Sequence, residues 1–411
     1  MATDWIVSQI SSREYYAVPR AFLRRGRLLH LYTDAWCSVG RGLLRRGPPT
    51  LRALAGRYQP EIPSDRVTAF TFQALRDHLR LRNSRTVEQT HLEYIRIGRE
   101  FCERVNRDLP GRVKDLLKHR FYGYNTGCLE TVQLLREKKI FCVVNQIDPA
   151  RVEEELVMEE VARWPGWENA EGYKPEAYWQ RLAAEWELAD AVVVNSQWSK
   201  DALVKQGVPG HKIIVVPLAY EESANSVARS STEGSLQVLW LGSVILRKGI
   251  QYLLEAARVL AGKQVEVTVA GPVHISPEAV RSAPANVKFI GRVTRDQAEG
   301  IYQQADVFVL PTISDGFAIT QLEAMSHGLP VITTPNCGQV VSDGIDGRIV
   351  PIRDAKALAE AIESYASDRR KLSESSSAAR QKARQFSLAK LEERLGRLED
   401  GPFKRDQCST S

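Results

Sequence analysis

Residues 306–334 read DVFVLPTISDGFAITQLEAMSHGLPVITT. The first six residues form a short apolar run that is typical of a buried strand. A turn containing Asp315, Gly316 and Phe317 follows and is predicted to open a helix that runs through Met325. PVITT then predicts another strand. Strand, loop, helix and strand in this order favour a parallel α/β architecture.

Short apolar runs alternate with amphipathic stretches in both directions from this segment. The runs that predict strands are WIVSQI (5–10), RLLHLYT (27–33), KIFCVVNQI (139–147), DAVVVNS (190–196), KIIVVPL (212–218), LQVLWLG (236–242), VEVTVAG (265–271), VKFIG (287–291) and RIVP (348–351). Helix-compatible patterns separate most of them, as over Tyr15–Arg25. We therefore expect doubly wound parallel sheets, whose ligands lie beyond the carboxyl ends of the strands.

The serine-rich segment Glu221–Ser235 (EESANSVARSSTEGS) has no hydrophobic periodicity and predicts a linker. A chain of 411 residues is also longer than one ordinary core requires. The expected fold class is α/β, with two Rossmann-like domains facing a cleft. The expected parts are an N-terminal domain (1–220), a linker (221–235), a C-terminal domain (236–386) and a last segment (387–411) that holds a helix, for which crossing back to the first domain is one option, and a polar tail.

Composition and charge restrict the class of protein. The hydrophobic fraction of 43% and the charged fraction of 26% are those of a globular protein, and no run of 18 apolar residues occurs. The start, MATDWIVSQISSREYY, lacks the basic end and apolar core of a signal peptide, so we expect a cytoplasmic protein. Residues 1–120 hold 23 Lys and Arg against 12 Asp and Glu, a net +11, whereas the remainder is −5. This imbalance indicates either an anionic partner or solvated helix faces.

Metal and thiol chemistry find little support. The six cysteines are scattered without a C-x-x-C pair, which favours buried, reduced thiols. The seven histidines show no spacing typical of metal ligands or of a catalytic triad, and His327 fits a helix end. The acidic stretch EEELVMEEVARWPGW (153–167) is interpreted as a solvated helix face. No metal site is predicted.

Two segments of the second half suit a phosphorylated ligand. In LWLGSVILRKGIQYLLEA (239–256) a strand ends at Gly242, and Arg247-Lys248-Gly249 precede a helix. Backbone N–H groups and cations at such a junction favour a diphosphate, although a basic helix start at the surface explains them equally well. Asp315 and Glu323 are eight residues apart, about two helical turns, and would lie on a similar face. Their carboxylates suit sugar and ribose hydroxyls, against the alternatives of a helix cap and a solvated residue.

These two segments, in this order, resemble the nucleotide-sugar domain of retaining glycosyltransferases of family 4, which have the GT-B fold. The resemblance extends from about residue 185 to residue 362. The matching motifs are Lys248-Gly249, Asp315-Gly316-Phe317-Ala318, Leu322-Glu323-Ala324-Met325 and Gly328-Leu329-Pro330-Val331. The resemblance implies a hexosyltransferase-like enzyme of carbohydrate biosynthesis that needs no metal or other cofactor. Its donor would be a nucleoside diphosphate sugar of the UDP, GDP or ADP type.

The resemblance also implies residue roles. Lys248 and Arg247 would neutralise the donor diphosphate and stabilise the leaving group. Glu323 would bind the ribose, and Asp315 would hold the transferred sugar together with backbone amides. The implied donor-binding residues are Gly242, Ser243, Gly249, Gly271, Gly291, Gly316, Phe317, Ala318 and Ile319.

The chain departs from the family pattern in both halves. Asp315 replaces the usual glutamate, and Ser243 stands where an arginine often follows the strand-end glycine. The first half lacks the usual Gly-Gly loop and middle-strand histidine. Gln146 and Asp148, in VVNQIDP, are the nearest acceptor-side candidates, although a turn-forming Asp-Pro is favoured for Asp148.

The first half would bind the acceptor in this fold. A carbohydrate or lipid-linked acceptor would suit its basic charge, and nucleic acid is disfavoured because no stacking platform is evident. The arginine-rich run GRGLLRRGPPTLRALAGRY (40–58) fits a membrane-surface helix or a flexible loop. A peripheral position on the inner face of the membrane therefore remains an alternative to a free cytoplasmic protein. The alternative to catalysis is a non-catalytic GT-B protein that binds nucleotides or sugars.

Overall fold

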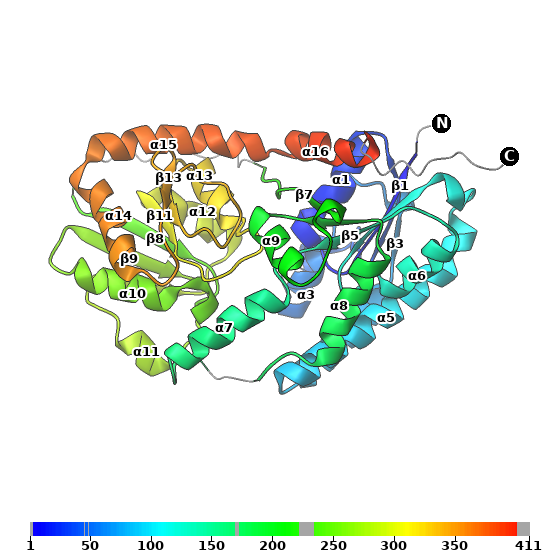
Figure 1. Cartoon of the computed structure of the whole chain (residues 1–411), viewed down its shortest axis with the longest axis horizontal. Coiled ribbons are helices and arrows are strands. Elements are labelled where there is room, and N and C mark those ends of the chain that lie inside the picture. Colours follow the sequence, from blue (N-terminus) through cyan, green and yellow to red (C-terminus); the bar gives the residue numbers. More distant parts are fainter. Residues whose placement is uncertain (1–2, 45, 48, 169–171, 222–233, 401–411) are drawn as a thin grey trace.

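The computed structural model describes residues 3–44, 46–47, 49–168, 172–221 and 234–400, and these build two parallel sheets side by side along the long axis (Figure 1). Within these residues the first sheet has seven strands in the order β3-β2-β1-β4-β5-β6-β7. They are β1 (Trp5–Gln9), β2 (Leu28–Thr33), β3 (Val67–Ala69), β4 (Arg120–Tyr124), β5 (Cys142–Gln146), β6 (Ala191–Val194) and β7 (Ile213–Val215).

The second sheet has six strands in the described part of the chain, in the order β10-β9-β8-β11-β12-β13. They are β8 (Leu236–Leu241), β9 (Val265–Ala270), β10 (Val287–Gly291), β11 (Val307–Leu310), β12 (Val331–Thr333) and β13 (Gly347–Ile349). In both sheets the strand order reverses, between β1 and β4 and between β8 and β11. Ligands of doubly wound sheets bind at such reversals, so a ligand site is expected beside these two points.

Helices connect the strands. Those of the first half are α1 (Ala17–Arg24), α2 (Arg41–Leu44), α3 (Pro49–Ala55), α4 (Thr71–Asn83), α5 (Val87–Arg112), α6 (Leu129–Glu137), α7 (Arg151–Arg163), α8 (Glu176–Leu188) and α9 (Gln197–Lys205). Those after β8 are α10 (Ile250–Val259), α11 (Pro277–Arg281), α12 (Arg295–Gln304), α13 (Thr320–Ser326), α14 (Ala355–Ser367), α15 (Arg369–Ala383) and α16 (Leu388–Asp400). Short 3-10 turns are η1 (Arg13–Tyr16), η2 (Ser64–Arg66), η3 (Leu116–Lys118), η4 (Gly210–Lys212), η5 (Leu246–Lys248) and η6 (Arg384–Phe386).

Both sheets are buried on both faces. In β1, Ile6 packs into one hydrophobic cluster and Trp5 and Val7 into another. In β11, Val307 and Val309 face one cluster and Phe308 and Leu310 the other. Successive side chains of a strand point to opposite faces, so helices must cover both sides. The predicted strands are confirmed, and the apolar runs without alternation reflect this two-sided burial.

Two helices leave their own half of the molecule. After α15, helix α16 returns to the first sheet and packs on α1 (Figure 1). Its Leu391, Leu395 and Leu398 are almost fully buried in the cluster around Trp5. In the opposite direction, α7 follows β5 and lies against η5 of the second half. Each half of the molecule therefore packs against a helix that is supplied by, or follows, the other half.

Some predicted segments take a different form. Residues 222–233 of the predicted linker and the tail from residue 401 lie outside the described residues. The described residues of the arginine-rich run, for which a membrane-surface helix or a flexible loop was expected, form two short helices, α2 and α3. Its ends are held by a hydrogen bond from Cys37 N to Arg57 O (2.8 Å) and by the Arg41 guanidinium, 4.7 Å from the Tyr58 ring centroid.

Candidate functional site

A cavity of about 330 Å³ lies between the two halves, beyond the carboxyl ends of both sheets. The second half contributes Lys248 and Asp315 to its wall, and the first half contributes Arg13, Ile147 and Asn195. These residues follow β8, β11, β1, β5 and β6, so the parallel strands bring them to one edge. The structure thus unites the predicted diphosphate loop and the Asp315 turn in one cavity.

The diphosphate loop is shaped by Gly249. Its φ of +73° is a left-handed conformation, and a Cβ there would lie 1.8 Å from the carbonyl oxygen of Pro311. Only glycine fits this turn, which ends η5 and begins α10 against the Asp315 segment. Glycine is therefore required by the approach of two backbone segments, and this approach places Lys248 beside Asp315.

The two cations of the loop are paired with carboxylates. Lys248 Nζ donates to Asp315 Oδ2, and Arg247 Nη1 lies 3.6 Å from the same oxygen. Arg247 Nη1 also donates to Glu153 Oε2 (3.2 Å) and to the carbonyl of Ser314 (3.1 Å). Burial acts to raise the pKa of Asp315, but Lys248 and Arg247 outweigh it and hold this pKa at about 2. Asp315 is therefore ionised at neutral pH.

The helix after Asp315 starts later than predicted. Asp315 Oδ1 accepts hydrogen bonds from the amides of Phe317 (3.0 Å) and Ala318 (2.7 Å), and Ala318 has a φ of +60°. This makes a separate turn, and α13 begins only at Thr320. The prediction that the helix opens at Asp315-Gly316-Phe317 is therefore wrong, and Asp315 precedes the helix that carries Glu323. The amides of Phe317 and Ala318, expected to face the sugar, are capped by the side chain of Asp315.

Gly316 has a role between the halves. A Cβ on Gly316 would lie 2.2 Å from the carbonyl oxygen of Ile147 in the first half. Its own carbonyl oxygen lies 3.5 Å from Ser199 Oγ on α9. Here the backbone of the second half meets that of the first, while Ala318 and Ile319 line the cavity beside it.

Glu323 lies in a neighbouring cavity of about 320 Å³. Its Oε2 accepts a hydrogen bond from Tyr302 Oη (2.9 Å), and the Tyr302 ring stacks on His327, 5.0 Å between centroids. Ile319 lines both cavities, so Glu323 and Asp315 flank one continuous surface. His327 caps the end of α13, as predicted.

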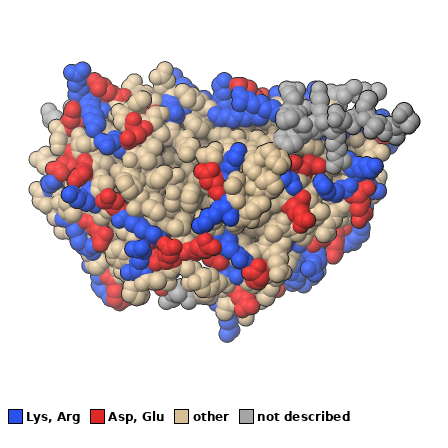
Figure 2. Space-filling view, in the orientation of Figure 1, with Lys and Arg blue, Asp and Glu red and all other residues tan. Residues whose placement is uncertain are grey.

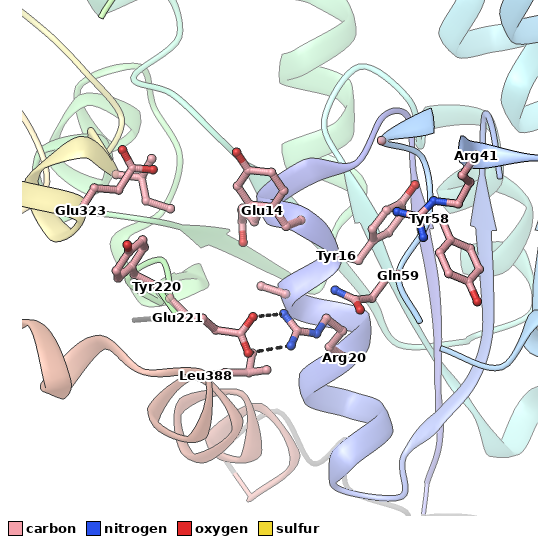
Figure 3. A pocket seen from close by; sticks show the side chains of 15 residues that line it. Glu14, Tyr16, Arg20, Arg41, Tyr58, Gln59, Tyr220, Glu221, Glu323 and Leu388 are labelled. Carbon is pink, nitrogen blue, oxygen red and sulfur yellow. Dashed lines mark hydrogen bonds and ion pairs between the residues drawn. The ribbon is translucent and has the colours of Figure 1, made fainter. Parts of the chain in front are cut away.

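The first-half wall of this second cavity includes η1 and α1, together with α2 and the segment after α3. Figure 3 shows Glu14 and Glu323 approaching from opposite sides, with Arg20 below paired to Glu221 through two hydrogen bonds (2.6 and 2.7 Å). Glu14, Tyr15 and Tyr16 all have positive φ, the strained backbone that often marks functional loops. Burial raises the pKa of the Glu14 carboxyl to about 7, with Arg13 acting in the opposite direction.

Sequence reasoning missed Arg13 and Glu14. They occupy the loop after the first strand, where a Gly-Gly pair was sought, and the letters SREYY (12–16) gave no sign of the left-handed backbone. Their place directly after a buried strand was the available signal, since this is where ligand-binding loops lie.

Six of the nine predicted donor-binding residues line neither cavity: Gly249 and Gly316, described above, and four more that lie at the same sheet edge. Gly242 and Gly271 follow β8 and β9, and a Cβ on Gly271 would lie 1.8 Å from the carbonyl oxygen of Gly242. Ser243 is exposed beside them, and Gly291 ends β10. Gly271 is required by this close approach to Gly242, whereas a Cβ on Gly291 would meet nothing within 4 Å.

Gln146 and Asp148 form a turn. The Gln146 amide donates to Asp148 Oδ1 (2.8 Å) and accepts from Trp186 Nε1 (3.1 Å), and Asp148 Oδ1 also accepts from the Ala150 amide (3.0 Å). Ile147 between them lines the cavity, whereas these two side chains do not. The turn-forming interpretation of Asp148 fits this geometry.

The prediction that the acidic stretch on α7 is a solvated helix face is wrong for Glu153 and Glu160. Glu153 accepts from Arg247 and from Ser314 Oγ (3.0 Å). Glu160 is fully buried and accepts from Tyr252 Oη (2.8 Å), Gln251 Nε2 (2.9 Å) and Arg353 Nε (2.5 Å). Burial also raises the pKa of Glu153. These carboxylates dock α7 on the second half and hold Arg247.

Metal and membrane features can be stated for the described residues. No cluster of three His, Cys, Asp or Glu side chains arranged to hold a metal ion occurs among them, and no helix among them is long and apolar enough to cross a bilayer. Five cysteines are free and buried, and Cys408 lies outside the described residues.

Comparison with known proteins identifies the second half. Residues 235–368 match the family described as "Glycosyl transferases group 1". The amylovoran biosynthesis glycosyltransferase AmsK of Erwinia amylovora is 28% identical over 196 residues, 44% of this chain and 47% of that protein. An N,N'-diacetylbacillosaminyl-diphospho-undecaprenol alpha-1,3-N-acetylgalactosaminyltransferase of Campylobacter jejuni is 30% identical over 131 residues, 30% of this chain and 34% of that protein. The matches span about half or less of these relatives.

Solved structures resemble the whole chain. Anabaena HepE in complex with UDP superposes with a TM-score of 0.62 at 15% identity, over 97% of this chain and 100% of that one. WaaG, a glycosyltransferase involved in lipopolysaccharide biosynthesis, gives 0.59 at 17% identity with the same coverage. The sucrose-phosphate synthase of Thermosynechococcus elongatus gives 0.64 at 17% identity, over 97% and 98%. The chain therefore has the GT-B fold, and residues 235–368 of its second half match the glycosyl transferases group 1 family.

Proposed function

We propose that this protein is a retaining glycosyltransferase of family 4. It transfers a sugar from a nucleoside diphosphate to a carbohydrate or lipid-linked acceptor without a metal ion. The observation that carries the proposal is that Lys248 and Asp315 line the cleft of a GT-B fold within a group 1 domain, while Arg247, which does not itself line the cavity, lies 3.6 Å from Asp315. Two cations at a strand-end loop suit a diphosphate.

Donor binding exchanges partners within this cluster. The diphosphate takes the place of Asp315 at Lys248 and Arg247, because it offers more negative charge and more acceptor oxygens than one carboxylate. Asp315 then turns toward the hydroxyls of the transferred sugar, and the amides of Phe317 and Ala318 are released to the donor. Glu323 binds the ribose from the neighbouring cavity and gives up or shares its bond to Tyr302.

The chemical step joins the acceptor oxygen to the anomeric carbon and breaks the bond from that carbon to the phosphate. The nucleoside diphosphate leaves with the electron pair, and Lys248 and Arg247 stabilise its charge. The acceptor hydroxyl attacks from the face that the leaving group vacates, and its proton passes to the departing phosphate. Configuration at the anomeric carbon is retained.

Relatives guide the choice of substrates to test. HepE was solved with UDP, which makes UDP sugars the first donor class. The Campylobacter relative is named for a diphospho-undecaprenol acceptor, and the basic residues 1–120 suit an acceptor that carries phosphate.

A donor panel tests the proposal. Thermal shift with UDP, GDP, ADP and their sugars identifies the nucleotide, and release of the nucleoside diphosphate from the best donor then measures turnover. Lys248→Ala abolishes release, whereas Lys356→Ala on α14, with an 83% exposed side chain, leaves it unchanged. Retention is read from the anomeric configuration of the product, and excess EDTA leaves the rate unaltered. Release by Lys248→Ala at the normal rate would contradict the proposal.

A second candidate is a non-catalytic GT-B protein that binds nucleotides or sugars. The internal pairing of both loop cations and the capping of two amides by Asp315 favour it, because these groups already satisfy each other. Asp315→Glu distinguishes the two candidates. The family's longer carboxylate raises donor turnover in an enzyme, whereas a binding protein that releases no nucleotide stays inactive in both forms.

A further inference from the structure

Helix α4 has its polar and apolar sides reversed. Phe72, Leu75 and Leu79 are exposed by 78%, 36% and 59%, while Gln73 and Asp77 of the same helix are buried. The three apolar positions follow the spacing i, i+3 and i+7 and so form one stripe along the solvent side. A helix at a protein surface normally buries its apolar stripe, so this exposed stripe indicates contact with something apolar outside the chain.

The buried polar side is satisfied by α5. Gln73 Nε2 donates to Asp77 Oδ1 (3.0 Å) and to Glu100 Oε2 (3.1 Å), and Arg96 Nη2 lies 3.5 Å from Asp77 Oδ1. These bonds fix the rotation of α4 about its axis, because turning the apolar stripe inward would leave Gln73 and Asp77 without their partners. The outward stripe is therefore built into the fold.

The charged residues beside the stripe indicate which kind of external apolar surface it contacts. Asp77 is the one acidic residue in the sequence of α4, and it is buried. Arg76 and Arg82 are exposed on the two sides of the apolar stripe, and Arg85 is exposed just beyond the helix. Long arginine side chains beside apolar residues suit the interface of a bilayer with anionic headgroups, where the apolar groups enter the acyl region and the guanidinium groups reach the phosphates.

The helix also lines a cavity that shares a residue with the cleft. A cavity of about 410 Å³ is lined by His78 and Leu81 of α4 and by Arg13 and Asn125 of the first sheet's loops. Arg13 also lines the cavity that holds Lys248 and Asp315. At 100° per residue, His78 lies between the side of α4 that lines this cavity and the exposed stripe. A surface that covers the stripe thus lies against the helix that lines this cavity, and the cavity shares Arg13 with the reaction site.

We propose that α4 docks this protein on an anionic lipid surface through Phe72, Leu75 and Leu79, flanked by Arg76, Arg82 and Arg85. The lipid then presents acceptors at the cavity beside Arg13, and this consequence rests on the proposed transferase function. The docking itself does not. Figure 2 shows acidic and basic side chains interspersed over the face it draws, so that face carries no extended charge of a single sign.

Co-sedimentation of the full chain with vesicles tests the docking. Equimolar phosphatidylcholine and phosphatidylglycerol vesicles bind the protein at low salt, and pure phosphatidylcholine vesicles bind it more weakly. Phe72→Ser with Leu79→Ser weakens partitioning by about tenfold or more, because two apolar groups no longer enter the bilayer. Leu117→Ser is the matched control, since Leu117 is 75% exposed on η3 of the same half, and it binds like the original protein.

Other outcomes have a defined meaning. If the original protein stays in the supernatant at low salt, or if the double variant sediments as well as Leu117→Ser, the proposal is wrong. A dimer that the double variant loses, together with no vesicle binding, would assign the stripe to a second copy of the chain instead. Arg82→Glu with Arg85→Glu removes the preference for phosphatidylglycerol. Thermal shift by nucleotides, measured without vesicles, is unchanged in every variant, so failure of docking and failure of the transferase proposal are distinguishable.

Discussion

Arg247 Nη1 donates a hydrogen bond of 3.2 Å to Glu153 Oε2, which connects the diphosphate loop of the second half to helix α7 of the first. In this arrangement Glu153 competes for the charge that a donor diphosphate would use. The amide of Leu246, next to Arg247, also donates to Glu168 beyond the end of α7. The loop is thus held by carboxylates before a ligand arrives.

Glu153→Gln is therefore expected to tighten binding of the nucleoside diphosphate about three- to tenfold, because Arg247 loses a competing charge but keeps a hydrogen-bond acceptor. Isothermal titration with the nucleotide identified by thermal shift measures this. Glu159→Gln is the control, since Glu159 is exposed on the same helix and pairs with Arg353. Unchanged or weaker binding by Glu153→Gln would show that Glu153 assists the phosphate site.

Asp315 stabilises the fold in a defined pH range. Its pKa is lowered from 3.8 to about 2, so its contribution is fully present above pH 4 and is lost as pH falls toward 2. Asp315→Asn should cost about 2 kcal/mol of unfolding free energy at pH 7. Urea melts from pH 7 to pH 3 should show the gap between the two proteins narrowing below pH 4, and a constant gap would contradict the assignment.

Glu14 has the opposite dependence. Its pKa is raised from 4.5 to about 7, so ionisation opposes folding as pH rises from 4.5 through 7. Glu14→Gln should therefore stabilise the protein by about 1–2 kcal/mol at pH 8, after allowance for partial solvent access, and by nothing near pH 4. Melting temperatures at the two pH values measure the difference. Equal gains at both would assign the effect to backbone strain.

Gly249 and Gly291 form a matched pair. Both have a left-handed φ, +73° and +71°, but a Cβ would lie 1.8 Å from Pro311 O at Gly249 and meets nothing within 4 Å at Gly291. Gly291→Ala should cost about 1 kcal/mol from strain alone. Gly249→Ala should cost about 3 kcal/mol or more and lower nucleotide affinity, because the loop must shift. Similar denaturant midpoints for the two variants would be inconsistent with this contact.

The returning helix α16 contributes to the first core. Leu395 is fully buried there, so Leu395→Ala should cost about 2–5 kcal/mol of unfolding free energy. Leu117→Ala, at an exposed site, should cost less than about 0.5 kcal/mol. A small effect of Leu395→Ala on the urea midpoint would show that α16 adds little to the fold.

Most strands and their parallel orientation could be predicted because runs such as those at 139–147 and 190–196 are buried on both faces and carry a strong signal, whereas β3 and β4 were not among the predicted strands. Lys248 and Asp315 could be placed together because loops after parallel strands share one sheet edge. The start of α13 could not, since a carboxylate that caps two amides and an alanine with positive φ leave no mark in the hydrophobic pattern. Glu153 was missed because its partners Arg247 and Ser314 are remote in sequence.

The exchange of helices between the halves has a consequence for fragments of this chain. A fragment that ends at residue 221 keeps α7 but lacks α16. It therefore exposes the apolar surface of α1 that α16 covers in the whole chain. A fragment that starts at residue 234 carries the leucines of α16 into water and lacks the carboxylates that hold Arg353 and Arg247. Each fragment exposes groups that the other fragment covers in the whole chain. We therefore expect the two fragments to be soluble when co-expressed and to aggregate when made alone.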